Sequence, residues 1–426
     1  MQFLHLAAAD HGGAGIAALR MHQGLRELGH ASCLAVLDGR SGDPDVIALG
    51  KNSLAFHARR WLRKANLKLA ADPDYYFQDQ ALSLRPDPGE LLSRAGARPS
   101  VIVVHFISHY LAAEDILALQ RATGAPVLWH LLDMALMTGG CHYAWRCDGY
   151  VRSCGNCPAL RWHGLGSDVS ARIWHGKSKA MQETRGWVVA GTSLLASQAA
   201  ASQLLGRRRI ETLLLGVSPQ TFAPGDKDAL RQQLGAAGAE RVIFFGAQKL
   251  DQRRKGMHLL LKALVRLADD WPSGTPLPTL LAAGNATDFA PLRGRGFRLI
   301  DLGFVGAATL AQAYAAADVF ACPSIEDSGP MMINESMMSG TPVVAFRMGV
   351  AEDLIESGAN GVVATLGDDA SFAAGLREVL LWSATHRGNA SASCRRVALE
   401  KCTPATQLAR FADIAQALVR SGGAAG

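Results

Sequence analysis

Two carboxylates, Asp327 and Glu335, stand eight residues apart around a predicted turn and a short helix. Val319 to Cys322 is typical of a buried strand, Ser328-Gly329-Pro330 of a turn, and Met331 to Met338 of a helix. At the start of such a helix the first N–H groups lack partners and the dipole is positive. Backbone amides there can bind sugar hydroxyls or phosphate, while the carboxylates accept from further hydroxyls. The segment therefore predicts a polyol-binding site.

Two other segments have the composition of diphosphate-binding loops. Arg253-Arg254-Lys255 follows a predicted strand and precedes Gly256 and a predicted helix, Met257 to Ala268. Cations at such a place can neutralise a diphosphate. Gly12-Gly13 directly follows another predicted strand, and glycines there let backbone amides approach a diphosphate or a sugar closely. For the basic segment the alternative is an exposed loop. For Gly12-Gly13 the alternative is an ordinary strand-to-helix turn.

Four of the eight cysteines lie between residues 134 and 160. Cys154 and Cys157 have the two-residue gap of metal-binding knuckles, and five residues separate Cys141 from Cys147. The pattern predicts a structural zinc site of four thiolates that holds this insertion, with His142 as an alternative to one of the cysteines. The other four cysteines are scattered and typical of small buried apolar residues.

Strands and helices alternate along the chain in the way that builds parallel sheets covered by helices. The first series of predicted strands is Phe3 to Ala9, Val101 to Phe106, Ala125 to Leu131, Trp187 to Thr192 and Glu211 to Leu215. The second series is Arg241 to Ala247, Leu277 to Ala283, Arg298 to Leu302 and Val319 to Cys322. Gly12 to Gly15 is predicted as a tight loop before a helix, Ile16 to Leu28. We therefore expect an α/β protein of two doubly wound domains, residues 1–218 and 219–403, that face each other across a ligand-binding cleft, followed by a helix over 404–420.

Length and composition agree with a two-domain globular protein: 426 residues, 49% hydrophobic and 19% charged. We find no apolar window of about 18 residues and no signal-peptide layout at the amino terminus, which predicts a cytoplasmic protein. The net charge is +6, and basic clusters such as Arg59-Arg60 and Arg63-Lys64 can face anionic lipid headgroups at the inner side of a membrane, nucleotides or water. The chain lacks the motifs of nucleic-acid binding.

The segment around Asp327 and Glu335 resembles the donor-binding signature of the retaining glycosyltransferases of family 4. In that signature seven residues separate an acidic residue from a Glu ahead of a Gly-Thr-Pro-Val-Val run, which here begins at Gly340. Asp327 stands where the family usually has Glu, and the neighbouring Glu326 is one position out of register. The resemblance implies that Glu335 holds the ribose and that Asp327 holds the donor sugar, together with the backbone of Ser328, Gly329, Pro330 and Met331.

The resemblance extends to the basic loop, where Lys255-Gly256 matches a Lys-Gly of the family. Ala247 stands where the family usually has an Arg, so Arg253 or Arg254 must supply that cation. These cations are then implied to neutralise the leaving nucleoside diphosphate.

A second segment, Thr138 to Tyr143, resembles a Thr-Gly-Gly-Cys-His-Tyr block in a branch of the same family that is linked to bacterial surface polysaccharides. Many members carry His-Asp shortly before this block, but here Leu132 precedes Asp133. Strand alternation puts His130 on the face of position 132. His130 either compensates for the missing His or is a core residue, and Asp133 is the candidate for orienting the acceptor hydroxyl.

The resemblance implies a retaining hexosyltransferase of the GT-B type, with an acceptor-binding first domain, a donor-binding second domain and a last helix that returns to the first domain. It moves a sugar from a nucleoside-diphosphate sugar to a glycan or lipid-linked acceptor, with Asp327, Asp133 and Lys255 as catalytic residues. No Asp-x-Asp pair stands out, so no catalytic metal is expected. The alternatives are a noncatalytic nucleotide-sugar-binding or assembly protein and an epimerase or phosphorylase of the same fold.

Overall fold

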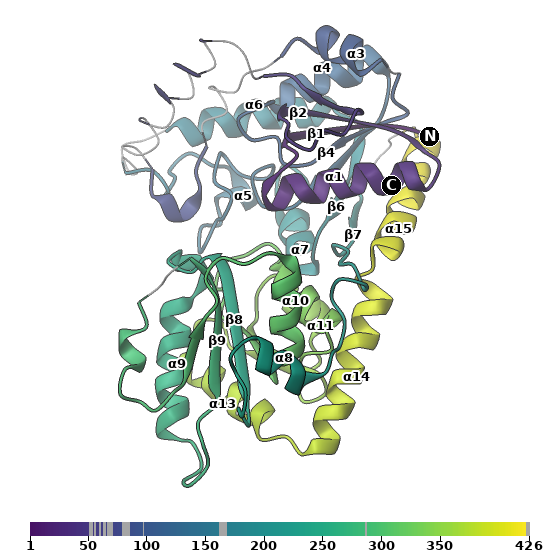
Figure 1. Ribbon diagram of the computed structural model, residues 1–426. Coiled ribbons are helices and arrows are strands. Elements are labelled where there is room, and N and C mark those ends of the chain that lie inside the picture. The colour runs from purple at the N-terminus through teal and green to yellow at the C-terminus, as the bar shows by residue number, and fades with distance from the viewer. Residues whose placement is uncertain are drawn as a thin grey trace. The chain divides into compact units, whose positions relative to one another are not determined.

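The computed structural model describes residues 1–50, 71–78, 86–96, 98–161, 168–285 and 288–422, with Leu54, His57, Ala58, Trp61, Leu62 and Ala65. Arg59, Arg60, Arg63 and Lys64 of the basic clusters lie outside the described residues. The chain forms two compact units, residues 1–213 with 408–426 and residues 214–407 (Figure 1). Both are parallel sheets covered by helices, which confirms the predicted α/β class.

The sheet of unit 1 has seven strands in the order β3-β2-β1-β4-β5-β6-β7. All of its pairings are parallel, and β1 lies between β2 and β4. Both faces are buried, which is why β4 is a continuous apolar run and β5 is buried at every residue, including His130. The strands are β1 Gln2–Ala9, β2 Ala31–Asp38, β3 Val46–Ala48, β4 Val101–Val104, β5 Val127–Leu131, β6 Gly186–Ala190 and β7 Ile210–Thr212.

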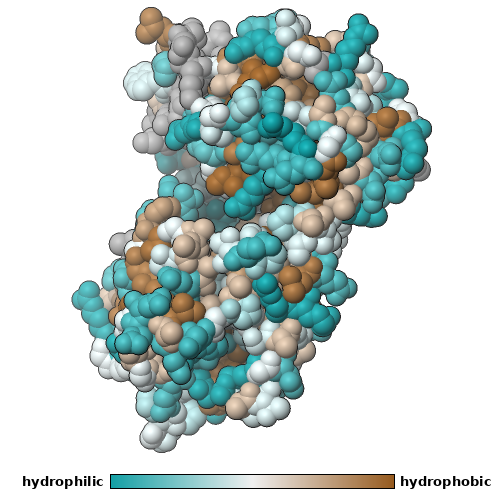
Figure 2. Space-filling model, turned by 45° about the vertical axis from the view of Figure 1, so that its right-hand side comes forward, coloured by the Kyte–Doolittle hydropathy of each residue, from teal (hydrophilic) through white to brown (hydrophobic). Residues whose placement is uncertain are grey.

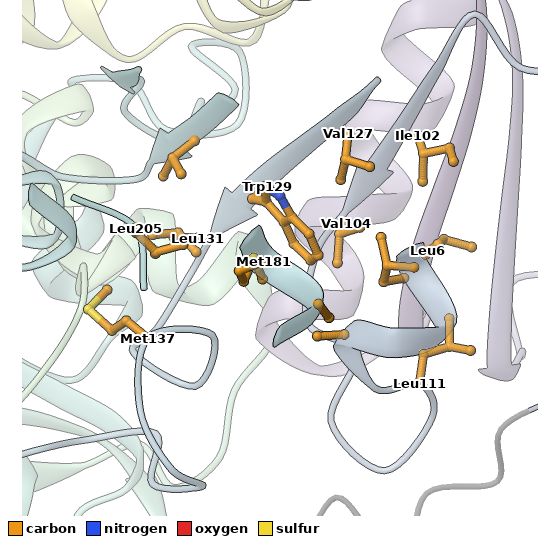
Figure 3. Packing of buried hydrophobic residues seen from close by; sticks show 14 of the residues in the cluster. Leu6, Ile102, Val104, Leu111, Val127, Trp129, Leu131, Met137, Met181 and Leu205 are labelled. Atoms are coloured by element: carbon orange, nitrogen blue, oxygen red, sulfur yellow. The ribbon is translucent and has the colours of Figure 1, made fainter. Parts of the chain in front are cut away.

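Helices cover both faces of this sheet. On one face the indole of Trp129 packs among Val104, Leu131 and Met181 (Figure 3), in a cluster that α3, α4, α6 and α7 complete. On the other face α1 and α15 pack against Phe3 and Val101. The helices are α1 Gly12–Glu27, α3 Pro88–Ala95, α4 Ala113–Thr123, α5 Gly149–Arg152, α6 Val169–Glu183, α7 Ser193–Ala201 and α15 Pro404–Arg420, with the 3₁₀ helix η1 Pro73–Tyr75.

The sheet of unit 2 has six parallel strands in the order β10-β9-β8-β11-β12-β13. Helices α9 and α13 cover one face, and α10, α11 and α14 cover the other. The strands are β8 Val242–Lys249, β9 Thr279–Asn285, β10 Leu299–Asp301, β11 Val319–Cys322, β12 Val343–Phe346 and β13 Gly361–Ala364. The helices are α8 Lys227–Gln233, α9 Met257–Asp269, α10 Ala307–Ala316, α11 Met331–Met338, α12 Ala351–Leu354, α13 Asp369–Leu380 and α14 Ala384–Lys401, with η3 Arg253–Lys255 and η4 Ala290–Leu292.

The structure corrects the sequence analysis at several elements. Strands β2, β3 and β13 were not predicted, and α1 begins at Gly12 rather than Ile16. The predicted loop over Gly12 to Gly15 is therefore wrong. A Cβ added at Gly15 would lie 2.6 Å from the carbonyl oxygen of Ala9, so this glycine lets the first turn of α1 pack directly on the end of β1.

Three histidines form a buried row across the middle of the unit 1 sheet. His5 lies on β1, His105 directly follows β4 and His130 lies on β5. His5 Nδ1 is 2.9 Å from His105 Nε2, and His105 Nδ1 is 3.0 Å from His130 Nδ1. Burial lowers the pKa of all three, that of His130 to about 4. His130 also stacks edge-on with Phe411 of α15, which makes it a core residue.

We expect the row to make unit 1 sensitive to acid. The unfolded chain binds protons near pH 6.5 at each histidine, whereas the folded row stays neutral, so the free energy of unfolding falls as the pH falls from about 7 towards 4. Between pH 7 and 5.5 the three histidines should remove roughly 4 kcal/mol, as measured by urea denaturation. His130→Leu should make this dependence shallower by about a third, and His175→Gln, at an exposed site on α6, should leave it unchanged. Equal slopes for His130→Leu and the wild-type protein would contradict the prediction.

Candidate functional site

An ion cluster forms where β11 leads into α11. The side chain of Asp327 is 10% exposed, and its Oδ2 accepts from Lys255 Nζ at 2.5 Å and from Arg254 Nη1 at 3.1 Å. Its Oδ1 accepts from the backbone N–H of Gly329 at 3.2 Å, which closes an Asx turn at the start of α11. The structure therefore brings together three of the residues predicted for the donor site. Of the two candidate arginines, Arg254 is the one that reaches Asp327, while Arg253 is exposed.

The charges of this cluster stabilise one another. Burial alone would raise the pKa of Asp327, but the Lys255 ammonium and the Arg254 guanidinium favour the carboxylate and hold that pKa below its usual value. Asp327 is therefore ionised at neutral pH. The two cations stand beside the amino terminus of α11, where an anionic group can bind.

Backbone contacts hold the turn that ends at Gly256 against the loop that contains Asp327. Gly256 ends η3 with a φ of 68°, and a Cβ added there would lie 1.8 Å from the carbonyl oxygen of Pro323. The N–H of Ile325 donates to the carbonyl of Arg254 at 2.8 Å. Only glycine permits this approach, which sets Lys255 beside Asp327.

Glu335 lies on α11, where its Oε2 accepts from the hydroxyl of Tyr314 at 3.0 Å. Tyr314 is on α10, is fully buried, and packs edge-on against Phe244 and Phe320. Burial raises the pKa of Tyr314 well above its ordinary value, so the phenol stays protonated and donates to the carboxylate. Sequence reasoning missed Tyr314, because no local pattern links two residues that pair across 21 positions.

In unit 1, Gly12 and Gly13 form the amino terminus of α1, as their predicted role requires. In the described part of the chain nothing lies within 4 Å of a Cβ added at either residue. The preceding Asp10 accepts from the backbone N–H groups of Arg40 and Ser41. These hydrogen bonds outweigh burial, which acts the other way, and lower the pKa of Asp10 to about 2.

Asp133 follows β5 and belongs to a chain of three side chains. Its Oδ2 lies 2.7 Å from His142 Nδ1, and His142 Nε2 lies 3.2 Å from the hydroxyl oxygen of Ser108, which follows β4. Burial opposes the ionisation of Asp133, but His142 and the N–H of Ala135 stabilise the carboxylate and lower its pKa. The sequence analysis missed Ser108 and considered His142 only as a zinc ligand.

The order carboxylate, imidazole, hydroxyl is that of a proton-transfer triad. Ser108 and Asp133 also line a cavity of about 30 Å³, together with the buried Lys177. A volume of about 10–15 Å³ on this measure already holds one water molecule, so the cavity has room for a water molecule or a hydroxyl group. The arrangement can orient a hydroxyl and hold its proton.

All four cysteines of the insertion line one cavity of about 150 Å³, and their thiols are free of disulfides. Burial raises the pKa of the Cys157 thiol to about 12 and that of Cys141 further. Within the described residues no three His, Cys, Asp or Glu side chains are already grouped as metal ligands. His142 has both ring nitrogens engaged by Asp133 and Ser108. The four-thiolate zinc site stays a prediction.

The family model that matches this chain lies within unit 2. Residues 239–381 match the family model "Glycosyl transferases group 1". A D-inositol 3-phosphate glycosyltransferase of Geodermatophilus obscurus is 34% identical over 184 residues, 41% of this chain and 40% of that protein. One of Mycobacteroides abscessus is 36% identical over 149 residues, 33% and 32% of the two chains. The chain thus spans 40% or less of the length of these two curated relatives.

Solved structures match over both units. Anabaena HepE in complex with UDP has a TM-score of 0.69 at 17% identity, covering 98% of this chain and all of that one. The lipopolysaccharide glycosyltransferase WaaG has a TM-score of 0.62 at 14% identity, covering 97% and 99%. The fold is therefore that of the GT-B glycosyltransferases, as predicted. Among the residues that the structure describes, no helix is long and apolar enough to cross a bilayer.

Substituting Gly256 should show how strongly the ion cluster depends on its backbone. We expect Gly256→Ala to lower the free energy of unfolding by more than about 2 kcal/mol, because the positive φ alone costs about 1–2 kcal/mol and the new Cβ would strike Pro323. Gly274→Ala is the matched control, since Gly274 has a φ of 79° and nothing within 4 Å of an added Cβ. Denaturant unfolding of both variants separates the cost of the positive φ from the cost of the clash with Pro323. An equal loss in the free energy of unfolding for the two variants would contradict the close approach of Gly256 to Pro323.

Proposed function

We propose that the protein is a retaining glycosyltransferase that moves a sugar from a nucleoside-diphosphate sugar to a hydroxyl of a glycan or lipid-linked glycan, in the synthesis of a surface polysaccharide. The observation that carries the proposal is the cluster of Asp327, Lys255 and Arg254 at the amino terminus of α11. It lies within the segment that matches group 1 glycosyl transferases. The names of HepE, bound to UDP or UDP-glucose, and of WaaG support the donor and the polysaccharide role.

In this proposal the donor's diphosphate binds to Lys255, Arg254 and the first amides of α11. Asp327 and the backbone from Ser328 to Met331 then hold the donor sugar, and Glu335 holds the ribose. The hydrogen bonds of Asp327 with Lys255 and Arg254, and that of Glu335 with Tyr314, support these roles, because they hold the charged groups in fixed places before the ligand arrives.

The reaction needs little covalent chemistry from the protein. The bond from the anomeric carbon to the diphosphate oxygen breaks with its electron pair on the diphosphate, and the acceptor oxygen bonds the same face of that carbon. The acceptor's proton passes to the departing phosphate, so no carboxylate nucleophile and no divalent ion enter the scheme. Lys255 and Arg254 lower the barrier because they face the charge that grows on the leaving group.

The acceptor is proposed to bind unit 1 at the carboxyl ends of its strands. Gly12 and Gly13 offer the amino terminus of α1, and Asp133, held by His142, orients the acceptor hydroxyl. For a lipid-linked acceptor, peripheral contact with an anionic membrane is supported by the sequence cluster of Arg59, Arg60, Arg63 and Lys64. Between these cations Trp61 is 70% exposed and Leu62 is 54% exposed.

Lys255→Ala tests whether the cluster acts on the leaving group. We expect turnover to fall about 100-fold with a smaller change in donor KM, because the lost interaction strengthens as the bond breaks. Asp327→Asn should also impair transfer, through the lost sugar contact. Lys262→Ala, at an exposed site on α9, is the matched control and should behave as wild type.

These assays use a panel of nucleoside-diphosphate sugars without added divalent ions, and the product should keep the donor's anomeric configuration. An inverted product, or transfer that chelators abolish and magnesium restores, would refute the mechanism. Nucleotide binding without transfer from any donor would identify a noncatalytic binder instead.

Glu335→Ala should weaken the binding of free nucleoside diphosphate by roughly 1.5–3 kcal/mol, the range for a hydrogen bond to a charged group. The substitution also leaves the buried Tyr314 hydroxyl without its acceptor, so a loss of stability is expected as well. Tyr314→Phe removes the same internal bond but leaves the carboxylate in place. Calorimetry should therefore show weak binding for Glu335→Ala and near-normal binding for Tyr314→Phe. Equal affinities in both variants would remove Glu335 from the site.

A further inference from the structure

The segment from Met134 to Leu160, in unit 1, contains one helix, α5, which has four residues. Long segments without regular structure need another source of order. Met137 joins the core cluster that contains Leu131 and Leu205 (Figure 3). The buried Lys177 donates to the carbonyls of Ala135 and Thr138 at 2.5 and 2.8 Å. These contacts hold the first part of the segment, and the four cysteines lie in the part beyond it.

Backbone amides donate to two of the four sulfur atoms. The N–H of Gly149 lies 3.4 Å from Cys147 Sγ, and the N–H of Gly139 lies 3.1 Å from Cys154 Sγ. For Cys147 the donor is the amide two residues ahead. The hydroxyl of Thr138 donates to the carbonyl oxygen of Cys141 at 2.6 Å, which holds the backbone at that cysteine. Amide hydrogen bonds to sulfur stabilise its thiolate form.

The four cysteines converge on one space. All four line a single cavity of about 150 Å³, and a Cβ added at Gly149 would lie 3.4 Å from Cys147 Sγ and 3.7 Å from Cys154 Sγ. The hydrogen bonds of the nearby Lys177 ammonium go to backbone carbonyls. A divalent cation in the shared cavity would satisfy all four sulfur atoms at once.

We propose that Cys141, Cys147, Cys154 and Cys157 bind one zinc ion, and that this ion holds Asp133 in place. The sulfur atoms would take up tetrahedral positions about 2.3 Å from the metal by rotation about their Cα–Cβ bonds in the cavity of about 150 Å³. Each thiol gives up its proton on binding. The site is structural, because four protein ligands leave no open position for a substrate.

The link to Asp133 runs through one residue. Cys141 is followed directly by His142, whose ring holds Asp133 at 2.7 Å and whose carbonyl accepts from the N–H of Met134 at 3.2 Å. Fixing Cys141 therefore fixes the imidazole that orients the carboxylate. This second part of the inference rests on the proposed function, whereas the metal site itself does not.

The first measurement is the metal content of the full-length protein, purified without a metal-affinity step. We expect about one zinc per chain in the wild type and in Cys33→Ser, a control on β2 outside the cluster, and a several-fold lower content in Cys157→Ser and Cys147→Ser. The cobalt-substituted wild type should show the visible bands of tetrahedral thiolate coordination. Zinc-free wild type from zinc-supplemented cells, iron in its place, disulfides among the four cysteines, or unchanged zinc in both variants would overturn the site.

A second measurement keeps the test valid if the variants do not fold. Titration of native wild-type protein with a mercurial reagent should release zinc as the thiols react, detected with a chromogenic chelator. Thiol reaction without release would contradict the site.

The positioning role has a separate readout. In the folded Cys147→Ser variant we expect acceptor KM to rise about tenfold while calorimetric UDP binding stays unchanged, because the donor residues lie in unit 2. Unchanged acceptor KM in a zinc-depleted variant would overturn the link to Asp133. If no transfer occurs with any donor, the proposed function fails, and the zinc measurements still decide the metal site.

Discussion

The pairing of Asp327 with Lys255 and Arg254 is the constraint on which unit 2 depends. Buried charges are stable only when paired, because removing one partner leaves the other without solvent or counter-ion. The turns after β8 and β11 must therefore meet. They do so because β8 and β11 are neighbours in the sheet, and because Gly256 lets the first turn touch the backbone at Pro323. The strand order of unit 2 is thus what makes an anion-attracting cluster possible.

In unit 1 the buried histidines have uncharged partners. Its interior contains polar groups, but the histidine row is kept neutral by burial and satisfied largely by itself. Towards the carboxyl ends of β4 and β5 the polar groups are Asp133, His142 and Ser108, which are joined by hydrogen bonds. On the face seen in Figure 2, hydrophilic and hydrophobic residues are interspersed.

The sequence was most informative where a role depends on local order. The alternation of apolar runs predicted the α/β class, and the spacing of Asp327 and Lys255 relative to their strands predicted residues that the structure brings together. The sequence did not predict partners that lie far apart along the chain. Tyr314 with Glu335, and Ser108 with His142, are brought together only by the fold. Strands β2, β3 and β13 were also missed. The start of α1 was missed because glycines that indicate a loop serve there for close packing.

The departure of this chain from the usual Glu at position 327 has a physical reason in the turn before α11. The short aspartate accepts from the amide two residues ahead with one oxygen and from Lys255 with the other. A glutamate, one methylene longer, would carry its carboxylate past the N–H of Gly329 and could not close the Asx turn. Aspartate therefore shapes the loop that leads into α11 while it pairs with the cations. The aspartate side chain is one methylene shorter than the glutamate of the signature, and this shorter length is what allows it to close the turn in this loop.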